Sequence, residues 1–154
     1  MAELQMRADL EVGVARMDAV HAEFVNCYNA LAQAPESGFV AALDDFIAHC
    51  ESHFAMENEW MATTAFPGCH RAEHDRVLQV MRDIRARAQR GDFALGRQLV
   101  REIPEWFETH ATGMDAALAY FLNSIGFDAQ TGRPPEGWKP AGEDADAGEK
   151  PRCT

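Results

Sequence analysis

Residues 46–61 have the sequence FIAHCESHFAMENEWM, and this stretch decides how the rest of the chain is interpreted. Its apolar side chains recur at steps of three and four residues, which is the spacing of one face of an α-helix. His53 and Glu57 fall on the same face, and their spacing of four residues brings both side chains to one side of the helix. The pattern predicts an amphipathic helix whose buried face carries two potential metal ligands.

Three further segments show the same spacing of apolar residues, and turn-forming residues separate them. They span residues 17–31, the stretch that begins near Cys69, and residues 95–121. Pro104 lies inside the last segment and is predicted to bend or split it, because proline lacks the N–H group of a helical hydrogen bond. Short connections favour antiparallel neighbours. The sequence therefore predicts an all-α fold, namely an antiparallel up-down four-helix bundle.

The inner face of the last segment is predicted to combine apolar and polar residues. A uniform α-helical spacing places the following residues on it: Leu95, Leu99, Ile103, Trp106, His110, Met114, Ala117 and Phe121. His110 and Asp115 are five residues apart, so on an α-helix they point in different directions. We therefore expect Asp115 to reach sideways, a position that suits a carboxylate bridging two metal ions.

Side chains of metal-binding types gather on the predicted inner faces of the four helices. They are His21, His53, Glu57, His70, His74, His110 and Asp115. Burying so many ionisable groups without partners would cost several kcal/mol for each group, so bound metal is the economical explanation. His49 flanks its apolar face, and we interpret it as an ordinary core or boundary histidine.

The ligand types narrow the choice of metal and the kind of site. Imidazole and carboxylate groups without thiolates suit iron, manganese or zinc. These seven side chains exceed what one tetrahedral zinc ion uses, so two ions are implied. The HExxH pattern of metalloproteases and the Glu-x-x-His pairs of ferritin-like di-iron bundles are both absent from the sequence.

Composition and charge exclude several classes of partner. The 154 residues carry a net charge of -11, which is the wrong sign for nucleic-acid phosphates or anionic membrane surfaces. With no secretory signal or membrane-spanning stretch in the sequence, a cytoplasmic protein is predicted. The four cysteines form no CxxC pair and are expected to be buried or idle thiols.

The chain divides by composition into a folded part and a tail. Residues 1–127 are predicted to form the helical bundle as one domain. Residues 128–154 are rich in proline, glycine and acidic residues, and we predict that they form a largely disordered tail. This tail is the segment most visibly available to a protein partner.

These residues, in this order and spacing, resemble the hemerythrin family, and its bacterial single-domain members in particular. The likeness runs from about Val12 to Phe121 and includes all seven ligand positions. The motifs that carry it are Val12-Gly13-Val14 with Met17-Asp18 before His21, His53-Phe54 with Glu57, Glu59 and Met61, and Phe66-Pro67 before His70 and His74.

The resemblance implies two iron ions that share a solvent-derived oxo or hydroxo bridge. One ion would be held by His70, His74 and His110, the other by His21 and His53, with Glu57 and Asp115 bridging both. The second ion would then keep one open position for dioxygen. The implied function is reversible dioxygen binding for storage, delivery or sensing. The alternative is a di-iron peroxidase, oxidase or redox sensor that uses the same centre.

The resemblance also places two residues near the expected dioxygen pocket. Trp106, one turn before His110, matches an aromatic residue that the family keeps there. Ala111 stands where bacterial members often have a bulky aliphatic residue. A smaller side chain at this position would open a route for solvent or ligand, which would favour autoxidation or catalysis over reversible carriage.

Overall fold

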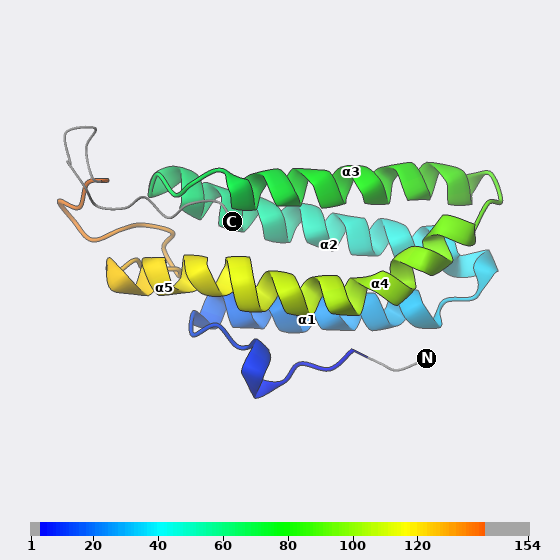
Figure 1. Cartoon of the computed structure of the whole chain (residues 1–154), viewed down its shortest axis with the longest axis horizontal. Coiled ribbons are helices and arrows are strands. Elements are labelled where there is room, and N and C mark those ends of the chain that lie inside the picture. Colours follow the sequence, from blue (N-terminus) through cyan, green and yellow to red (C-terminus); the bar gives the residue numbers. More distant parts are fainter. Residues whose placement is uncertain (1–3, 141–154) are drawn as a thin grey trace.

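The helices run alternately up and down a bundle, as the computed structural model in Figure 1 shows for residues 4–140, the part of the chain that it describes. After a short 3-10 turn, η1 (Ala8–Leu10), the long helices are α1 (Ala15–Gln33), α2 (Glu36–Thr63), α3 (Cys69–Gln89) and α4 (Ala94–His110). A π-helical segment, η2 (Ala111–Asp115), joins α4 to α5 (Ala116–Ser124). The predicted all-α antiparallel bundle is confirmed.

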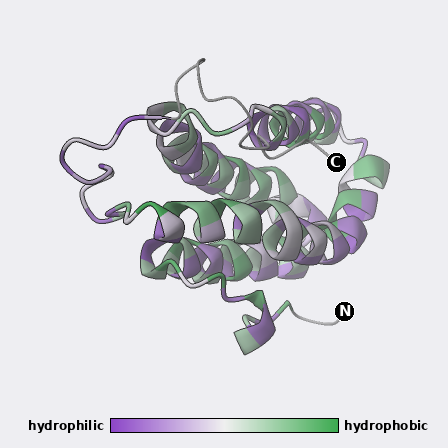
Figure 2. Ribbon diagram, turned by 60° about the vertical axis from the view of Figure 1, so that its left-hand side comes forward, coloured by the Kyte–Doolittle hydropathy of each residue, from purple (hydrophilic) through white to green (hydrophobic). Residues whose placement is uncertain are grey.

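Each helix has a hydrophobic and a hydrophilic side, and the hydrophobic sides form the core (Figure 2). One apolar cluster, which includes Phe24, Phe46 and Phe107, fills the part of the bundle made by α1 to α4. A second apolar cluster, which includes Trp60 and Leu118, lies where α5 meets the end of α2. On α1, α2 and the α4–α5 arm, the predicted metal ligands lie near the position along the chain where the first cluster gives way to the second.

Pro104 does not split its helix, because α4 continues through it from Ala94 to His110. Without an N–H group, Pro104 leaves the carbonyl of Val100 without its helical donor. The Tyr28 hydroxyl of α1 donates a hydrogen bond to this buried carbonyl oxygen at 2.7 Å. Of the predicted bend or split at Pro104, the split is wrong, since a donor from another helix replaces the missing one, and the bend stays a prediction.

Replacing Tyr28 by phenylalanine is expected to lower the free energy of unfolding by about 1–3 kcal/mol, because the Val100 carbonyl would stay buried without a donor. Urea unfolding measures this loss. Adding Pro104→Ala to Tyr28→Phe restores a backbone N–H and is expected to recover part of the stability, as a double-mutant cycle would show. If Tyr28→Phe lowered the free energy of unfolding equally in the unsubstituted protein and in Pro104→Ala, this account would be contradicted.

The buried face after His110 differs from the predicted one by one residue. We expected Met114, Ala117 and Phe121 to point inward, but none of them is buried. The residues one position later, Asp115, Leu118 and Leu122, are buried instead. The π-helical segment accommodates one extra residue in a turn. The same offset already occurs in α4, where Gly96, Val100 and Phe107 are buried in place of the predicted Leu95, Leu99 and Trp106, so the turn is not its only cause.

The described part of the predicted tail, residues 128–140, begins beside the end of α2. Asp128 pairs with Arg133 in an isolated bridge, and the Phe127 ring packs edge-on against Trp60. The rest of the predicted tail, 141–154, lies outside the described residues, so its disorder stays a prediction. Among the helices of residues 4–140, none is long and apolar enough to cross a membrane.

The described cysteines differ in their state. Cys50 is a free thiol in the apolar core, as predicted, and burial raises its pKa well above the ordinary value, which makes it unreactive. Cys27 is a half-buried free thiol. Cys69 is disulfide-bonded, so the expectation of an idle thiol is wrong at this position.

Candidate metal centre

The structure brings all seven predicted ligands together in the middle of the bundle. Every one of them is at most 5% exposed. They come from α1 (His21), α2 (His53 and Glu57), α3 (His70 and His74), α4 (His110) and η2 (Asp115). Their ligand atoms form two groups, one with three histidines and one with two, and Glu57 belongs to both groups.

The three-histidine group has its ring nitrogens at the spacing of ligands around one ion. The Nε2 atom of His110 lies 3.1 Å from that of His70 and 3.3 Å from that of His74. Nitrogen ligands about 2.1 Å from an ion and at right angles to each other lie about 3.0 Å apart. One metal ion between the three nitrogens therefore fits this group.

Each of the two carboxylates faces both groups. Asp115 places Oδ1 2.9 Å from His70 Nε2 and Oδ2 3.0 Å from His21 Nε2. Glu57 places Oε2 2.5 Å from His53 Nε2 and Oε1 3.4 Å from His70 Nε2. One oxygen of each carboxylate thus points to the three-histidine group and the other to the two-histidine group. This is the arrangement that a carboxylate needs to bridge two metal ions.

Several of these buried polar atoms lack hydrogen-bond partners among the described residues. They include both oxygens of Glu57 and of Asp115, and the Nε2 atoms of His21 and His53. A buried acceptor without a partner costs about 1–3 kcal/mol, and more when it is charged. Cations placed between the two groups would satisfy all of these atoms, so the residues present fit a pair of metal ions.

The local backbone explains how His110 and Asp115 come to the same side of the helical arm. Along η2 the chain makes a wider turn than an α-helix, so residues five apart lie about one turn apart. The Asp115 Oδ1 atom is accordingly 3.2 Å from His110 Nε2. The predicted sideways reach of Asp115 from a regular helix is wrong, because the backbone, not the side chain, makes the adjustment.

The comparison with known proteins agrees with this geometry. The model of the family described as "Hemerythrin HHE cation binding domain" matches residues 12–122, which include all seven side chains of the cluster. The chain belongs to the hemerythrin family. Membership implies that this hemerythrin binds iron, the metal that the sequence indicated only through its resemblance.

Two relatives support the assignment over almost their whole length. A bacteriohemerythrin of Ralstonia nicotianae is 50% identical over 132 residues, which cover 84% of this chain and 96% of the relative. A bacteriohemerythrin of Stenotrophomonas maltophilia is 29% identical over 148 residues, covering 90% of this chain and 94% of the relative. No solved structure matches this hemerythrin significantly.

Residues around the cluster orient its histidines. The His74 ring donates from Nδ1 to the side-chain oxygen of Asn58 at 2.9 Å, which leaves Nε2 unprotonated for a metal. The Phe54 ring stacks on His74 with the ring centres 4.0 Å apart. Asn58 was not predicted from the sequence, although its place directly after Glu57 on the helix with two predicted ligands was a signal.

Trp106 lies against the cluster, and a hydrogen bond holds it there, whereas its place in a dioxygen pocket stays a prediction. Its ring stacks on His110, with centres 4.6 Å apart and planes 16° apart. The indole Nε1 donates to Glu73 Oε1 at 3.0 Å, and Arg76 donates two hydrogen bonds to the same carboxylate. Arg76 first, and Trp106 in addition, lower the pKa of Glu73 to about 2. Glu73 was also missed by sequence analysis.

Ala111 and His49 were also singled out from the sequence, and neither belongs to the two ligand groups. Ala111 is completely buried in the large apolar cluster at the start of η2. His49 belongs to neither group of ligands, and its ring lies edge-on to those of Phe24 and His53. Burial, and then the neighbouring His53, lower the pKa of His49 to about 4, so it is a neutral ring in an apolar setting.

The histidines of the cluster differ in how strongly they hold protons without metal. Burial and the nearby His70 and His110 rings lower the pKa of His74 to about 2, so this ring is neutral. Burial also opposes charge on His70, but the carboxylates of Asp115 and Glu57 raise its pKa to about 9. At neutral pH a metal ion must therefore displace a proton from His70.

The apparent metal affinity of this hemerythrin is expected to rise with pH between about 6.5 and 9. Because the pKa of His70 is raised from 6.5 to about 9, its proton stabilises the metal-free fold fully below 6.5, and this contribution is lost as the pH rises through 9. Losing one proton per ion gives about a tenfold gain in affinity per pH unit. Competition titrations against a chelator measure it, and a flat profile over this range would contradict it.

Proposed function

We propose that this hemerythrin binds dioxygen reversibly at two iron ions held by the seven side chains, as an oxygen store, carrier or sensor. The observation that carries the proposal is the unequal division of the ligands. Glu57 belongs to both groups and Asp115 has an oxygen near a histidine of each, whereas three histidines lie on one side and two on the other. An ion on the two-histidine side would be held by one histidine fewer, which would leave room for an external ligand.

When bound, such an ion pair supplies the electrons and the open coordination position that dioxygen requires. The protein supplies a dry surrounding on the two-histidine side. The Phe107 ring lies edge-on to His21 with centres 5.3 Å apart, and Phe24 lies edge-on to His53 at 6.2 Å. Apolar rings at these positions exclude water and external reductants from the site, a role that the surroundings of metal sites commonly have.

The test begins with iron analysis of the purified protein, followed by anaerobic reduction and addition of oxygen under visible spectroscopy. We expect about two irons per chain, as a two-metal site requires, and an absorption band that appears with oxygen and disappears when oxygen is removed. Direct conversion to a stable oxidised form would favour redox sensing instead. Turnover with peroxide and a reductant would favour a peroxidase or oxidase.

Two histidines one turn apart on α2 provide a matched pair for this test. His53→Gln is expected to remove the oxygen-dependent band, because His53 is one of only two histidines on the proposed dioxygen side. His49→Gln is expected to keep the iron and the band, because His49 belongs to neither ligand group. An oxygen-dependent band that persists in His53→Gln would overturn the assignment of the dioxygen side.

A further inference from the structure

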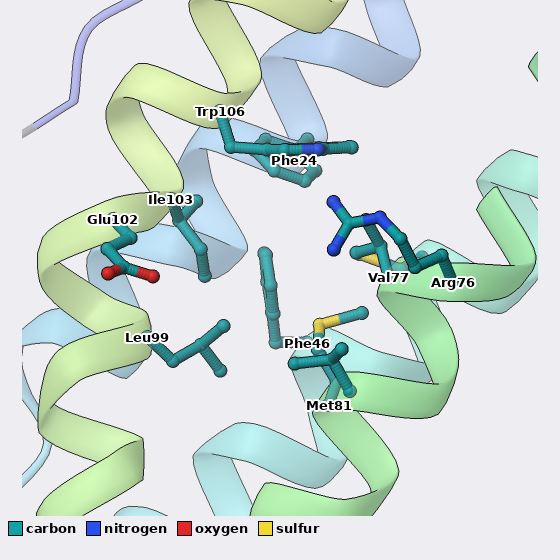
Figure 3. A pocket seen from close by; sticks show the side chains of 11 residues that line it. Phe24, Phe46, Arg76, Val77, Met81, Leu99, Glu102, Ile103 and Trp106 are labelled. Carbon is teal, nitrogen blue, oxygen red and sulfur yellow. The ribbon is translucent and has the colours of Figure 1, made fainter. Parts of the chain in front are cut away.

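A cavity of about 100 Å³ lies between α3 and α4, outside the metal cluster. Figure 3 shows the side chains of the two helices pointing toward one another across it, with Met81 on α3 facing Leu99 and Ile103 on α4. The exposed charged residues Arg76 and Glu102 also line the cavity. It is therefore a mostly apolar space whose lining reaches the surface of the bundle.

The inner wall of the cavity consists of two aromatic residues that also touch the metal cluster. Trp106 lines the cavity and stacks on His110 with ring centres 4.6 Å apart. Phe24 lines it and lies edge-on to His53 with ring centres 6.2 Å apart. A single layer of side chains thus separates the cavity from a histidine of each ligand group.

Hydrogen bonds near the surface of the bundle help to hold this wall in place. The indole of Trp106 is fixed by its hydrogen bond to Glu73, and Arg76, which lines the cavity, holds Glu73 by two hydrogen bonds. The Arg76 side chain is 58% exposed. The position of Trp106 therefore depends on contacts near the surface of the bundle as well as on core packing.

We propose that this cavity binds small uncharged apolar molecules and is the route by which dioxygen reaches the cluster. A water molecule needs two to four polar partners, which the apolar inner part of the lining, away from Arg76 and Glu102, does not provide, whereas dry apolar cavities of about 150 Å³ bind xenon or benzene. The space between Met81, Leu99 and Ile103 suits molecules between the sizes of dioxygen and xenon. Only the second part, the route, rests on the proposed function.

Xenon tests the binding site without any oxygen chemistry. Xenon-pressurised crystals of the iron-loaded protein are expected to show xenon beside Leu99, which lines this cavity. Leu99→Trp fills the space and is expected to abolish xenon binding, whereas Leu99→Ala enlarges it and is expected to raise the occupancy. Leu95→Trp is the matched control, because Leu95 is one turn away on α4 and does not line this cavity. An empty cavity in the unsubstituted protein, or xenon retained in Leu99→Trp, would overturn the binding site.

The route is tested by the rate at which the reduced, iron-loaded protein reacts with oxygen in stopped flow. Leu99→Trp is expected to slow this reaction about tenfold, while Leu95→Trp leaves it unchanged and both variants keep their iron. Loss of xenon without a change in rate would overturn the route, since oxygen would then enter elsewhere. If oxygen fails to bind reversibly even in the unsubstituted protein, the proposed function fails while the xenon result still decides the cavity.

Discussion

Replacing Glu57 by glutamine is expected to remove both metal ions from the protein. Glu57 is completely buried and belongs to both ligand groups, with one oxygen near His53 and the other near His70. Glutamine keeps the size of the side chain but loses the negative charge and one ligand oxygen. Since changes to residues that merely support metal ligands cost about 10–100-fold in affinity, we expect a loss greater than about 100-fold at each site.

Metal analysis after dialysis measures the effect, and Glu59→Gln is its control. Glu59 lies two residues away on the same helix and is exposed, so the change in net charge is the same while the cluster is untouched. A variant that keeps one ion per chain would show that Glu57 serves a single site and would contradict the bridging role.

The same substitution is expected to remove the stabilisation that metal gives to the fold. Saturating metal at about 1,000 times its dissociation constant raises the free energy of unfolding by about 4 kcal/mol per site. Thermal unfolding with and without iron should therefore separate the unsubstituted protein and Glu59→Gln from Glu57→Gln. An iron-dependent rise in Tm that survives in Glu57→Gln would contradict this expectation.

Inserting one alanine after Thr112 is the second change expected to destroy the cluster. The η2 segment already accommodates one residue more than an α-helical turn, and it brings Asp115 to the side of His110. A further residue would rotate Asp115 by about 100° away from the histidines. Both oxygens of Asp115 would then leave the two groups, so we expect loss of both ions.

Deleting Thr112 is the matched control for this insertion, and the expected result is the opposite. The deletion shortens the His110–Asp115 spacing from five residues to four, which a regular α-helix places on one side. Thr112 is exposed and its hydroxyl donates only to the backbone carbonyl of Glu108. Retained metal in the deletion and lost metal in the insertion would confirm the role of the π-helical turn. Equal metal content in the two variants would contradict it.

The four helices and the types of the seven clustered side chains could be predicted because their signals are local. The spacing of apolar residues is set by the helix period, so α1, α2 and α3 follow from short stretches of sequence. His53 and Glu57, or His70 and His74, need only a regular helix to lie side by side. The match to the family model confirms the resemblance to hemerythrins that was seen in the sequence. The division at residue 127, the cytoplasmic location and a partner for the tail stay predictions.

The arm from α4 to α5 has two features that local sequence patterns could not predict, namely the unbroken helix at Pro104 and the π-helical turn. Proline is the usual sign of a broken helix, yet Tyr28, far away in sequence, supplies the donor that Pro104 removes. The sequence of η2, ATGMD at residues 111–115, contains no residue that predicts a π-helical turn. The turn is compatible with the fold, since residues beyond it such as Leu118 and Leu122 are buried in the core.

The sequence by itself determined that this is a four-helix bundle with buried histidines and carboxylates, because apolar periodicity and the cost of burying charge are properties of single helices. Only the tertiary structure decided which oxygen of Glu57 and Asp115 faces which histidines, where the backbone widens, and that a cavity lies beside Trp106. These features depend on side chains from different helices meeting at distances of a few ångströms. No spacing along one helix encodes such contacts.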